Sequence, residues 1–261
     1  MLVRFVHERL LYRLSRSPHA DRFVLKGAML LTTWLHETAR GTRDLDLLGF
    51  GDPDEQRIID IFREVLAIAS DDGVEFDLDA LRVARIREDI KYGGVRLRGT
   101  ASLSGARIAV AIDIGFGDSV EPGLQTIDYP ALLDLPAPRL RAYAPETVIA
   151  EKFQAMVALG RAKSRMKDFY DIWILTKVFN FTSDRLGRAI AATFARRRTA
   201  VPAELPDVLR PAFAEDPLKQ RQWAAFIVDL DNAPLELRTV TGELANFLMG
   251  AAAAAGGLES S

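Results

Sequence analysis

The spacing of apolar side chains changes repeatedly over the first half of the chain. Apolar positions recur with a helical period over residues 1–16, which predicts an amphipathic helix. A short apolar stretch from Phe23 to Leu25 runs into Lys26-Gly27 and a second helical pattern over 28–37, so a strand, a glycine turn and a helix are predicted in that order. Residues 44–47 alternate aspartate with leucine, which is the period-two pattern of a strand.

The next segment combines one helix with several strands. A capping residue followed by Pro53 predicts a helix that runs to about Ala69. Three alternating stretches follow, and the turn signal Ser104-Gly105-Ala106 between the last two predicts an antiparallel hairpin. The three stretches cover residues 81–86, 95–103 and 107–114.

Beyond residue 140 the pattern becomes helical. Predicted helices cover residues 145–159, 164–178, 184–198, 217–229 and 235–249. The sequence therefore predicts an α+β fold, with an α/β lobe over residues 1–140 and a helical lobe over 141–250. The alanine- and glycine-rich end, residues 251–261, is predicted to be a disordered tail.

Composition narrows the possible chemistry. The chain contains no cysteine, which excludes disulfides, thiolate zinc sites and cysteine nucleophiles. His7, His19 and His36 lack the helical spacing of a metal pair, and neither a Walker motif nor Gly-x-Ser-x-Gly is present. The net charge of -2 neither suggests nor excludes RNA. No apolar run approaches the ~20 residues of a membrane span, and the N-terminus lacks the apolar centre of a signal peptide, so we expect a cytoplasmic protein.

Three aspartates are candidates for metal chemistry. On a strand, Asp44 and Asp46 would project from one face about 7 Å apart at their Cα atoms. Asp113 would lie on the polar face of the second hairpin strand, beside the small Ala109 and Ala111. Like charges on one face need a positive partner, and Mg²⁺ prefers such oxygen ligands. Three carboxylates on neighbouring strands would hold two metal ions, although an isolated Asp-x-Asp is more often a solvated strand face.

Basic residues suggest where a polyanion could bind. Arg161, Lys163, Arg165 and Lys167 form a basic stretch between two predicted helices, and such clusters can follow an RNA backbone. Most arginine-rich stretches are only solvated surface. Lys167 and Asp171 are also helical i, i+4 neighbours of opposite charge, which is typical of an ion-paired face.

Five short motifs occur in a fixed order between about residues 20 and 180. They are Phe23-Val24-Leu25-Lys26-Gly27-Ala28, Thr42-Arg43-Asp44-Leu45-Asp46-Leu47, Pro145-Glu146, Glu151-Lys152-Phe153 and Arg165-Met166-Lys167-Asp168-Phe169-Tyr170-Asp171. Together they resemble the AbiEii/AbiGii-toxin family, within the DNA polymerase β-like nucleotidyltransferase superfamily. The resemblance implies a metal-dependent nucleotidyltransferase with a mixed sheet and a helical C-terminal lobe, which uses a nucleoside triphosphate with Mg²⁺ or Mn²⁺ and releases pyrophosphate.

The resemblance also implies roles for individual residues. Asp44, Asp46 and Asp113 would hold the metals, and Asp113 would help to deprotonate the acceptor hydroxyl. Lys152 and the Gly27 turn would hold phosphate, while Lys167 and Asp168 would lie near the substrates and Asp171 would be structural. Ala28 departs from the family's glycine or serine, so phosphate binding would also depend on Lys26 or Arg43. The residues placed near RNA are Arg161, Lys163 and Arg165.

The biological expectation follows from the same resemblance. The resemblance implies the toxin of a type IV toxin-antitoxin system, connected with phage defence. Such a toxin would add nucleotides to an acceptor such as a tRNA 3′ end and would be neutralised by a cognate antitoxin. Three alternatives remain open at this point. They are a nucleotidyltransferase acting on a small molecule such as an antibiotic, one acting on a protein hydroxyl, and a degenerate nucleotide-binding module.

Overall fold

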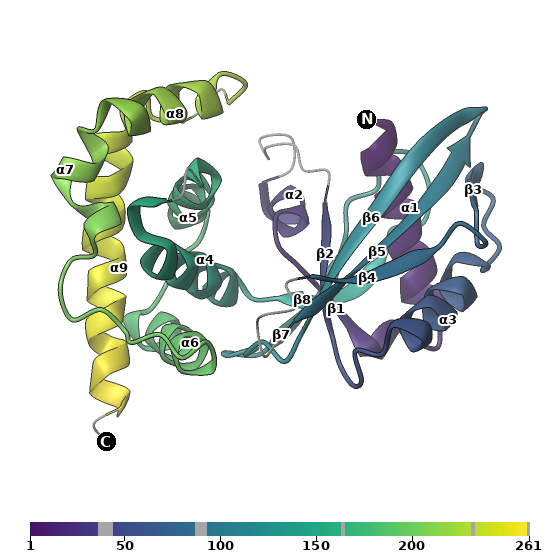
Figure 1. Ribbon diagram of the computed structural model, residues 1–261, viewed down its shortest axis with the longest axis horizontal. Helices are drawn as coiled ribbons and strands as arrows, with labels where there is room; N and C mark the ends of the chain where they lie inside the picture. Colours follow the sequence, from purple (N-terminus) through teal and green to yellow (C-terminus); the bar gives the residue numbers. More distant parts are fainter. Residues whose placement is uncertain (36–43, 87–92, 163–164, 231–232, 260–261) are drawn as a thin grey trace. The chain divides into compact units, whose positions relative to one another are not determined.

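The computed structural model describes residues 1–35, 44–86, 93–162, 165–230 and 233–259, and the chain divides into two compact units (Figure 1). Unit 1 comprises residues 1–118 and 125–143, and unit 2 comprises 119–124 and 144–261. The main division falls a few residues after the expected position near 140. Residues 119–124 group with the helical unit, which sequence patterning did not predict.

Unit 1 is built on a mixed sheet. The strand order is β3-β5-β6-β2-β1-β8-β7, with β4 paired to β5. The β2–β6 and β1–β8 pairs are parallel, whereas β1–β2, β3–β5, β4–β5 and β5–β6 are antiparallel. The strands are β1 (Phe23–Lys26), β2 (Leu45–Gly49), β3 (Val74–Phe76), β4 (Arg82–Ile86), β5 (Gly94–Leu103), β6 (Ala106–Phe116), β7 (Leu124–Asp128) and β8 (Arg139–Tyr143).

The β5–β6 hairpin turns where the sequence predicts it. Ser104 and Gly105 both adopt positive φ, 48° and 82°, which matches the twist that a two-residue hairpin turn requires. Leu103 pairs with Ala106, and the register continues without interruption to Val95 opposite Ile114. The hairpin prediction is confirmed. Its register decides which side chains share a face, and therefore positions the candidate site.

The apolar face of the sheet is covered by α1 (Leu2–Arg16) and α3 (Glu55–Leu66) (Figure 1). Phe23 of β1 meets Phe62 of α3 at 5.3 Å between ring centroids, and both side chains are buried. Burying an aromatic side chain of this size contributes roughly 1.5–3 kcal/mol. The backbone N–H of Arg57 donates to the Asp54 side chain, so α3 begins two residues later than predicted. A third helix of this unit, α2 (Met29–Leu35), contacts β1.

His7 of α1 gives unit 1 a measurable pH dependence. Its side chain is buried, and Nε2 has no hydrogen-bond partner within the described residues. Burial lowers the pKa of His7 from 6.5 to about 4, against the opposing attraction of Asp44. His7 therefore becomes protonated below pH 6.5 in the unfolded chain, but only below about pH 4 in the folded chain. The free energy of unfolding falls across this window as the pH falls.

We expect His7→Leu to remove about 3 kcal/mol of that loss between pH 6.5 and 4. The measurement is chemical denaturation of wild type and variant at both pH values, comparing only the difference between the two proteins, since other carboxylates titrate in both. Equal pH slopes for wild type and His7→Leu would show that the imidazole is not held neutral.

Unit 2 is helical. Phe153 of α4 packs on Phe194 of α6, with ring centroids 5.4 Å apart, and α6 also contacts α9. Apart from α9, the longer helices match the predicted stretches closely. Helix α4 begins at Pro145, which occupies the first turn, where its missing N–H is not needed. The helices are α4 (Pro145–Leu159), α5 (Met166–Val178), α6 (Ser183–Arg196), α7 (Pro211–Ala214), α8 (Pro217–Ile227) and α9 (Leu237–Glu259).

The predicted disordered tail requires a correction. Helix α9 continues to Glu259, and Ala251, Ala252 and Ala255 are buried. Gly187 of α6 explains this packing, because a Cβ added there would lie 3.1 Å from Cβ of Ala254. Alanine favours helix and allows close approach of two helices, so a tract that looked featureless is part of the core. Within the described residues, no helix is long and apolar enough to cross a membrane.

Candidate active site

Four charged residues form a row across the sheet of unit 1. Lys26 of β1 is the register partner of Asp46 on β2, Asp46 is the partner of Asp113 on β6, and Asp113 is the partner of Arg96 on β5. Directly paired residues project to the same side of a sheet, so all four lie on one face. The order along the row is cation, acid, acid, cation, and we call these four residues the acid row. The two predicted acids are therefore side by side on adjacent strands.

Asp44 belongs to the same face. It directly precedes β2, two positions before Asp46, and it is exposed. The pKa of Arg96 indicates that Asp44 lies near the other two aspartates. The hydrogen-bonded Asp113 raises the pKa of Arg96 above its usual value, and the nearby charges of Asp44 and Asp46 raise it further. All three predicted carboxylates are thus close enough to act on one guanidinium.

Arg96 binds Asp113 through two parallel bonds. Its Nε donates to Oδ1 and its Nη2 donates to Oδ2, both at 2.6 Å. Within the described part of the chain, no three His, Cys, Asp or Glu side chains are placed to hold a metal ion. The donor set still suits a hard divalent cation, because three carboxylates share one partly exposed face.

Gly27 lies directly against Asp46. The residue has φ +74°, and a Cβ placed there would overlap Oδ2 of Asp46. A side chain is therefore excluded twice, by the backbone conformation and by the carboxylate. The predicted glycine turn and the predicted acid are in contact, which sequence spacing alone did not establish. Ala28 follows the turn and is buried with no hydroxyl to offer, and α2 begins at the next residue.

Lys26 is engaged by a residue that sequence reasoning missed. Its amine lies 2.5 Å from Oδ2 of Asp118, and both side chains are mostly buried. Tyr143 of β8 places its hydroxyl 3.4 Å from the same oxygen and its ring 5.4 Å from the Lys26 amine. Lys26 therefore lies beside Asp46 at one end of the acid row, and its amine is paired with Asp118.

The other predicted catalytic residues lie in unit 2. Lys152 of α4 donates to Asp171 at 2.6 Å and to Asp168 at 3.2 Å, and the side chains of the two aspartates are 0% and 1% exposed. Arg165 also holds Asp168, with Nε 2.6 Å from Oδ2. Lys152 of α4, Asp168 and Asp171 of α5 and Arg165 directly before α5 form an ion network in which the two aspartates are buried and Arg165 is 38% exposed. The interpretation of Asp171 as structural agrees with this placement.

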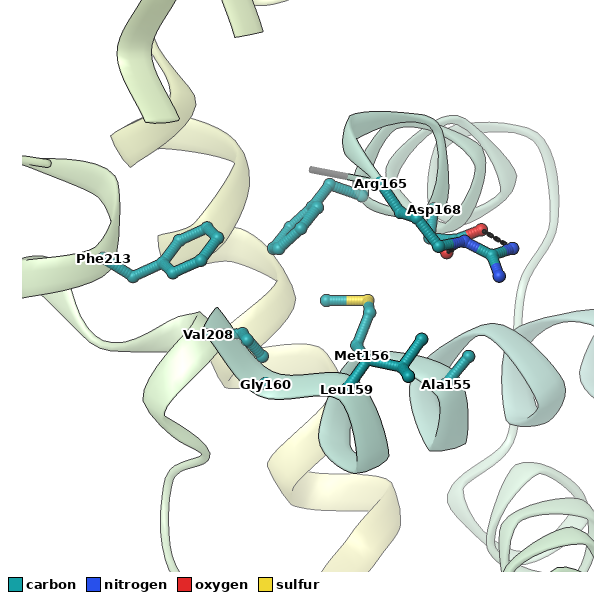
Figure 2. Close-up of a pocket in the computed structure, with 9 residues that line it drawn as sticks. Ala155, Met156, Leu159, Gly160, Arg165, Asp168, Val208 and Phe213 are labelled. Atoms are coloured by element: carbon teal, nitrogen blue, oxygen red, sulfur yellow. Dashed lines mark hydrogen bonds and ion pairs between the residues drawn. The ribbon is translucent and has the colours of Figure 1, made fainter. Parts of the chain in front are cut away.

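An apolar pocket adjoins this network. Figure 2 shows Arg165 and Asp168 together on the side away from Phe213, with Met156 and Leu159 from α4 below them. Lys167 is exposed and makes no ion pair with the described residues, so the i, i+4 pair with Asp171 does not form. The lining is mainly apolar, which suits a hydrophobic group better than a triphosphate.

The predicted RNA-binding residues are already paired where they can be described. Arg161 lies 3.3 Å from Asp207 and 3.4 Å from Asp216, and Arg165 is held by Asp168. Lys163 and the predicted phosphate ligand Arg43 lie outside the described residues. The basic stretch is thus partly neutralised by its own unit.

Known structures share this architecture. Crystal structures of JHP933 and of a putative nucleotidyltransferase, both from Helicobacter pylori, each give a TM-score of 0.51. The first is 17% identical and covers 98% of this chain and 94% of its own, and the second is 16% identical and covers 99% and 96%. Likeness at this identity establishes the fold, and it agrees with the predicted α+β class. A search of the curated proteins found no match.

The family assignment comes from the sequence. The family model described as "Nucleotidyl transferase AbiEii toxin, Type IV TA system" matches residues 9–242, which includes most of both units. The match contains the acid row, the Gly27 turn and the Lys152 network. The predicted resemblance is confirmed, and the chain belongs to the AbiEii family of nucleotidyltransferase toxins of type IV toxin–antitoxin systems.

Proposed function

We propose that this nucleotidyltransferase transfers a nucleoside monophosphate from a triphosphate to a hydroxyl of tRNA, with divalent metal held by Asp44, Asp46 and Asp113. The observation that carries the metal site is the register of β2 and β6, which makes Asp46 and Asp113 direct neighbours on one face. The Gly27 turn against Asp46 supports placing the phosphates there, since glycine lets the backbone approach closely.

The reaction forms one bond and breaks one. The acceptor oxygen attacks the α-phosphorus, the bond from that phosphorus to the bridging oxygen breaks, and pyrophosphate leaves. A divalent cation supplies charge neutralisation on the phosphate oxygens. Asp113 is proposed to take the proton of the attacking hydroxyl, and Lys26, at the other end of the acid pair, adds positive charge beside the leaving phosphates. Mg²⁺ or Mn²⁺ is the expected ion.

An RNA acceptor is supported by the open part of the same sheet face. Arg98 of β5 pairs with Ala111, and Arg107 of β6 pairs with Ser102, which places both arginines on the face of Asp113. Both are exposed, and neither makes an ion pair with the described residues. The small Ala109 and Ala111 lie on the same face of β6, between Arg107 and Asp113. A chain of phosphates could follow these guanidinium groups toward the acids.

The decisive assay incubates the protein with Mg²⁺, each α-labelled triphosphate, and either total tRNA or protein extract. The proposal expects label on tRNA and none on protein. Label on protein would instead select the protein-modifying alternative, and tight triphosphate binding without any transfer would select the degenerate module. Label on an added aminoglycoside would select the small-molecule alternative.

As a member of a toxin family of toxin–antitoxin systems, the protein is expected to have a cognate antitoxin as partner.

We predict that the double substitution Arg98→Glu and Arg107→Glu weakens tRNA binding by at least about tenfold at low salt, because two phosphate contacts are lost and two repulsions are added. Arg57→Glu is the control, since Arg57 is exposed on α3, which covers the opposite face. Fluorescence anisotropy with labelled tRNA measures both. Equal binding by the double variant and wild type would remove the sheet face from the acceptor path.

A further inference from the structure

Arg96 is a cation at the acid row that the proposed chemistry does not use. Its guanidinium donates to both oxygens of Asp113 at 2.6 Å. The negative charges of Asp44 and Asp46 also attract it. A two-bond pair of this kind fixes direction as well as distance. Arg96 therefore occupies the side of Asp113 that a metal ion would also require.

We propose that Arg96 is the resident counter-ion of the metal-free site, and that a divalent cation must displace it from Asp113 to bind. The inference rests on the proposed metal site and adds the residue that sets how readily the site loads. Without metal, three carboxylates on one face repel one another, and one guanidinium relieves part of that repulsion. A bound divalent cation would offset two of the three carboxylate charges and would itself repel the guanidinium, so the attraction that holds Arg96 at Asp113 would weaken.

The surroundings of Arg96 allow this exchange. Its side chain is 37% exposed, and its hydrogen bonds to described side chains go to Asp113 alone. Releasing it exchanges one partly solvated pair for water, which costs little. Lys152 in unit 2 is different, because its two carboxylate partners are almost fully buried. Arg96 is thus a movable cation, whereas Lys152 is a fixed one.

The test measures metal binding directly, without nucleotide or RNA. Free Mn²⁺ is counted by electron paramagnetic resonance during titration of wild type and Arg96→Met, which keeps the aliphatic stem and removes the charge. We expect Mn²⁺ to bind the variant roughly tenfold more tightly, because one positive charge a few ångströms from the ion is gone. Adding Asp113→Asn to Arg96→Met should abolish the gain.

Arg85→Met is the matched control. Arg85 is also a strand arginine of unit 1 paired with a carboxylate, at 3.3 Å from Glu55, but it aligns with Val95 and so lies on the other face. The Mn²⁺ affinity of the Arg85→Met variant should stay within about twofold of wild type. An equal gain in both variants would show that only net charge matters, which would overturn the role of Arg96.

The remaining outcomes separate the inference from the proposed function. Equal, Asp113-dependent binding by wild type and Arg96→Met overturns the inference and leaves the metal site standing. No binding by either protein overturns both. The expected gain without any nucleotide transfer supports the inference and overturns the function. If Arg96→Met does not fold, the Nε–H resonance of Arg96 in labelled wild type decides, since Mg²⁺ should shift it, and an unchanged resonance at saturating Mg²⁺ contradicts displacement.

Discussion

Replacing Asp46 by asparagine is expected to lower the rate of nucleotide transfer by about three orders of magnitude. Asparagine keeps the shape of the side chain, so the contact with Gly27 is preserved. What is lost is one negative charge and one strong metal ligand between Lys26 and Asp113. Metal stabilisation of the transition state is worth several kcal/mol, and each ~1.4 kcal/mol corresponds to a factor of ten in rate.

The control for this substitution is Asp60→Asn. Asp60 is an exposed aspartate of α3 that pairs with Arg63 at 3.6 Å, so its loss should leave transfer within about twofold of wild type. Both proteins are compared by single-turnover transfer of label at saturating triphosphate. Chemical denaturation of Asp46→Asn and wild type checks that the variant is folded. Retention of more than about a tenth of the activity would remove Asp46 from the chemistry.

Replacing Lys152 by methionine is expected to destabilise unit 2 by about 3–5 kcal/mol. The substitution removes an ammonium that lies 2.6 Å from Asp171 and 3.2 Å from Asp168, two carboxylates with almost no exposure. Asp168 keeps its pair with Arg165 in the variant. Chemical denaturation at pH 7 measures the loss of stability.

Two variants isolate the network from a general loss of lysine. Lys177→Met breaks an exposed pair with Glu243, whose side chains are 46% and 43% exposed, and should cost less than about 1 kcal/mol. Adding Asp171→Asn to Lys152→Met should recover part of the stability, because the stranded charge is removed as well. If Lys152→Met is as stable as wild type but inactive, the lysine serves substrates and not the fold, as the family resemblance alone suggested.

The acid row could have been predicted more fully than it was. The Ser104-Gly105 turn fixes the hairpin register, and counting outward from it places Arg96 opposite Asp113. The turn and Asp113 are thus enough to predict that Arg96 lies beside Asp113 on the partner strand. The parallel pairing of β2 with β6 could not be predicted in the same way. It joins segments 67 residues apart, as from Asp46 to Asp113, and no local signal sets that register.

Unit 2 shows a different limit. The helix positions follow from apolar periodicity, and most bounds agree within a few residues. Local spacing favoured a Lys167–Asp171 pair on one helix, yet Asp171 turns inward to Lys152 on another. Burial decided the partner, because a carboxylate with no exposure needs a cation in the interior. The same holds for the alanine-rich end of α9, where packing against Gly187 orders a segment that composition described as a tail.

The central claim is that Asp46 and Asp113 hold a divalent metal beside the Gly27 turn. The most direct measurement is anomalous diffraction from crystals grown with Mn²⁺ and a non-hydrolysable triphosphate. We predict a peak within about 2.2 Å of carboxylate oxygens of both aspartates, with phosphate density next to Gly27 and Arg96 turned away from Asp113. A peak elsewhere, or an Arg96–Asp113 pair that persists beside the bound triphosphate, would contradict it.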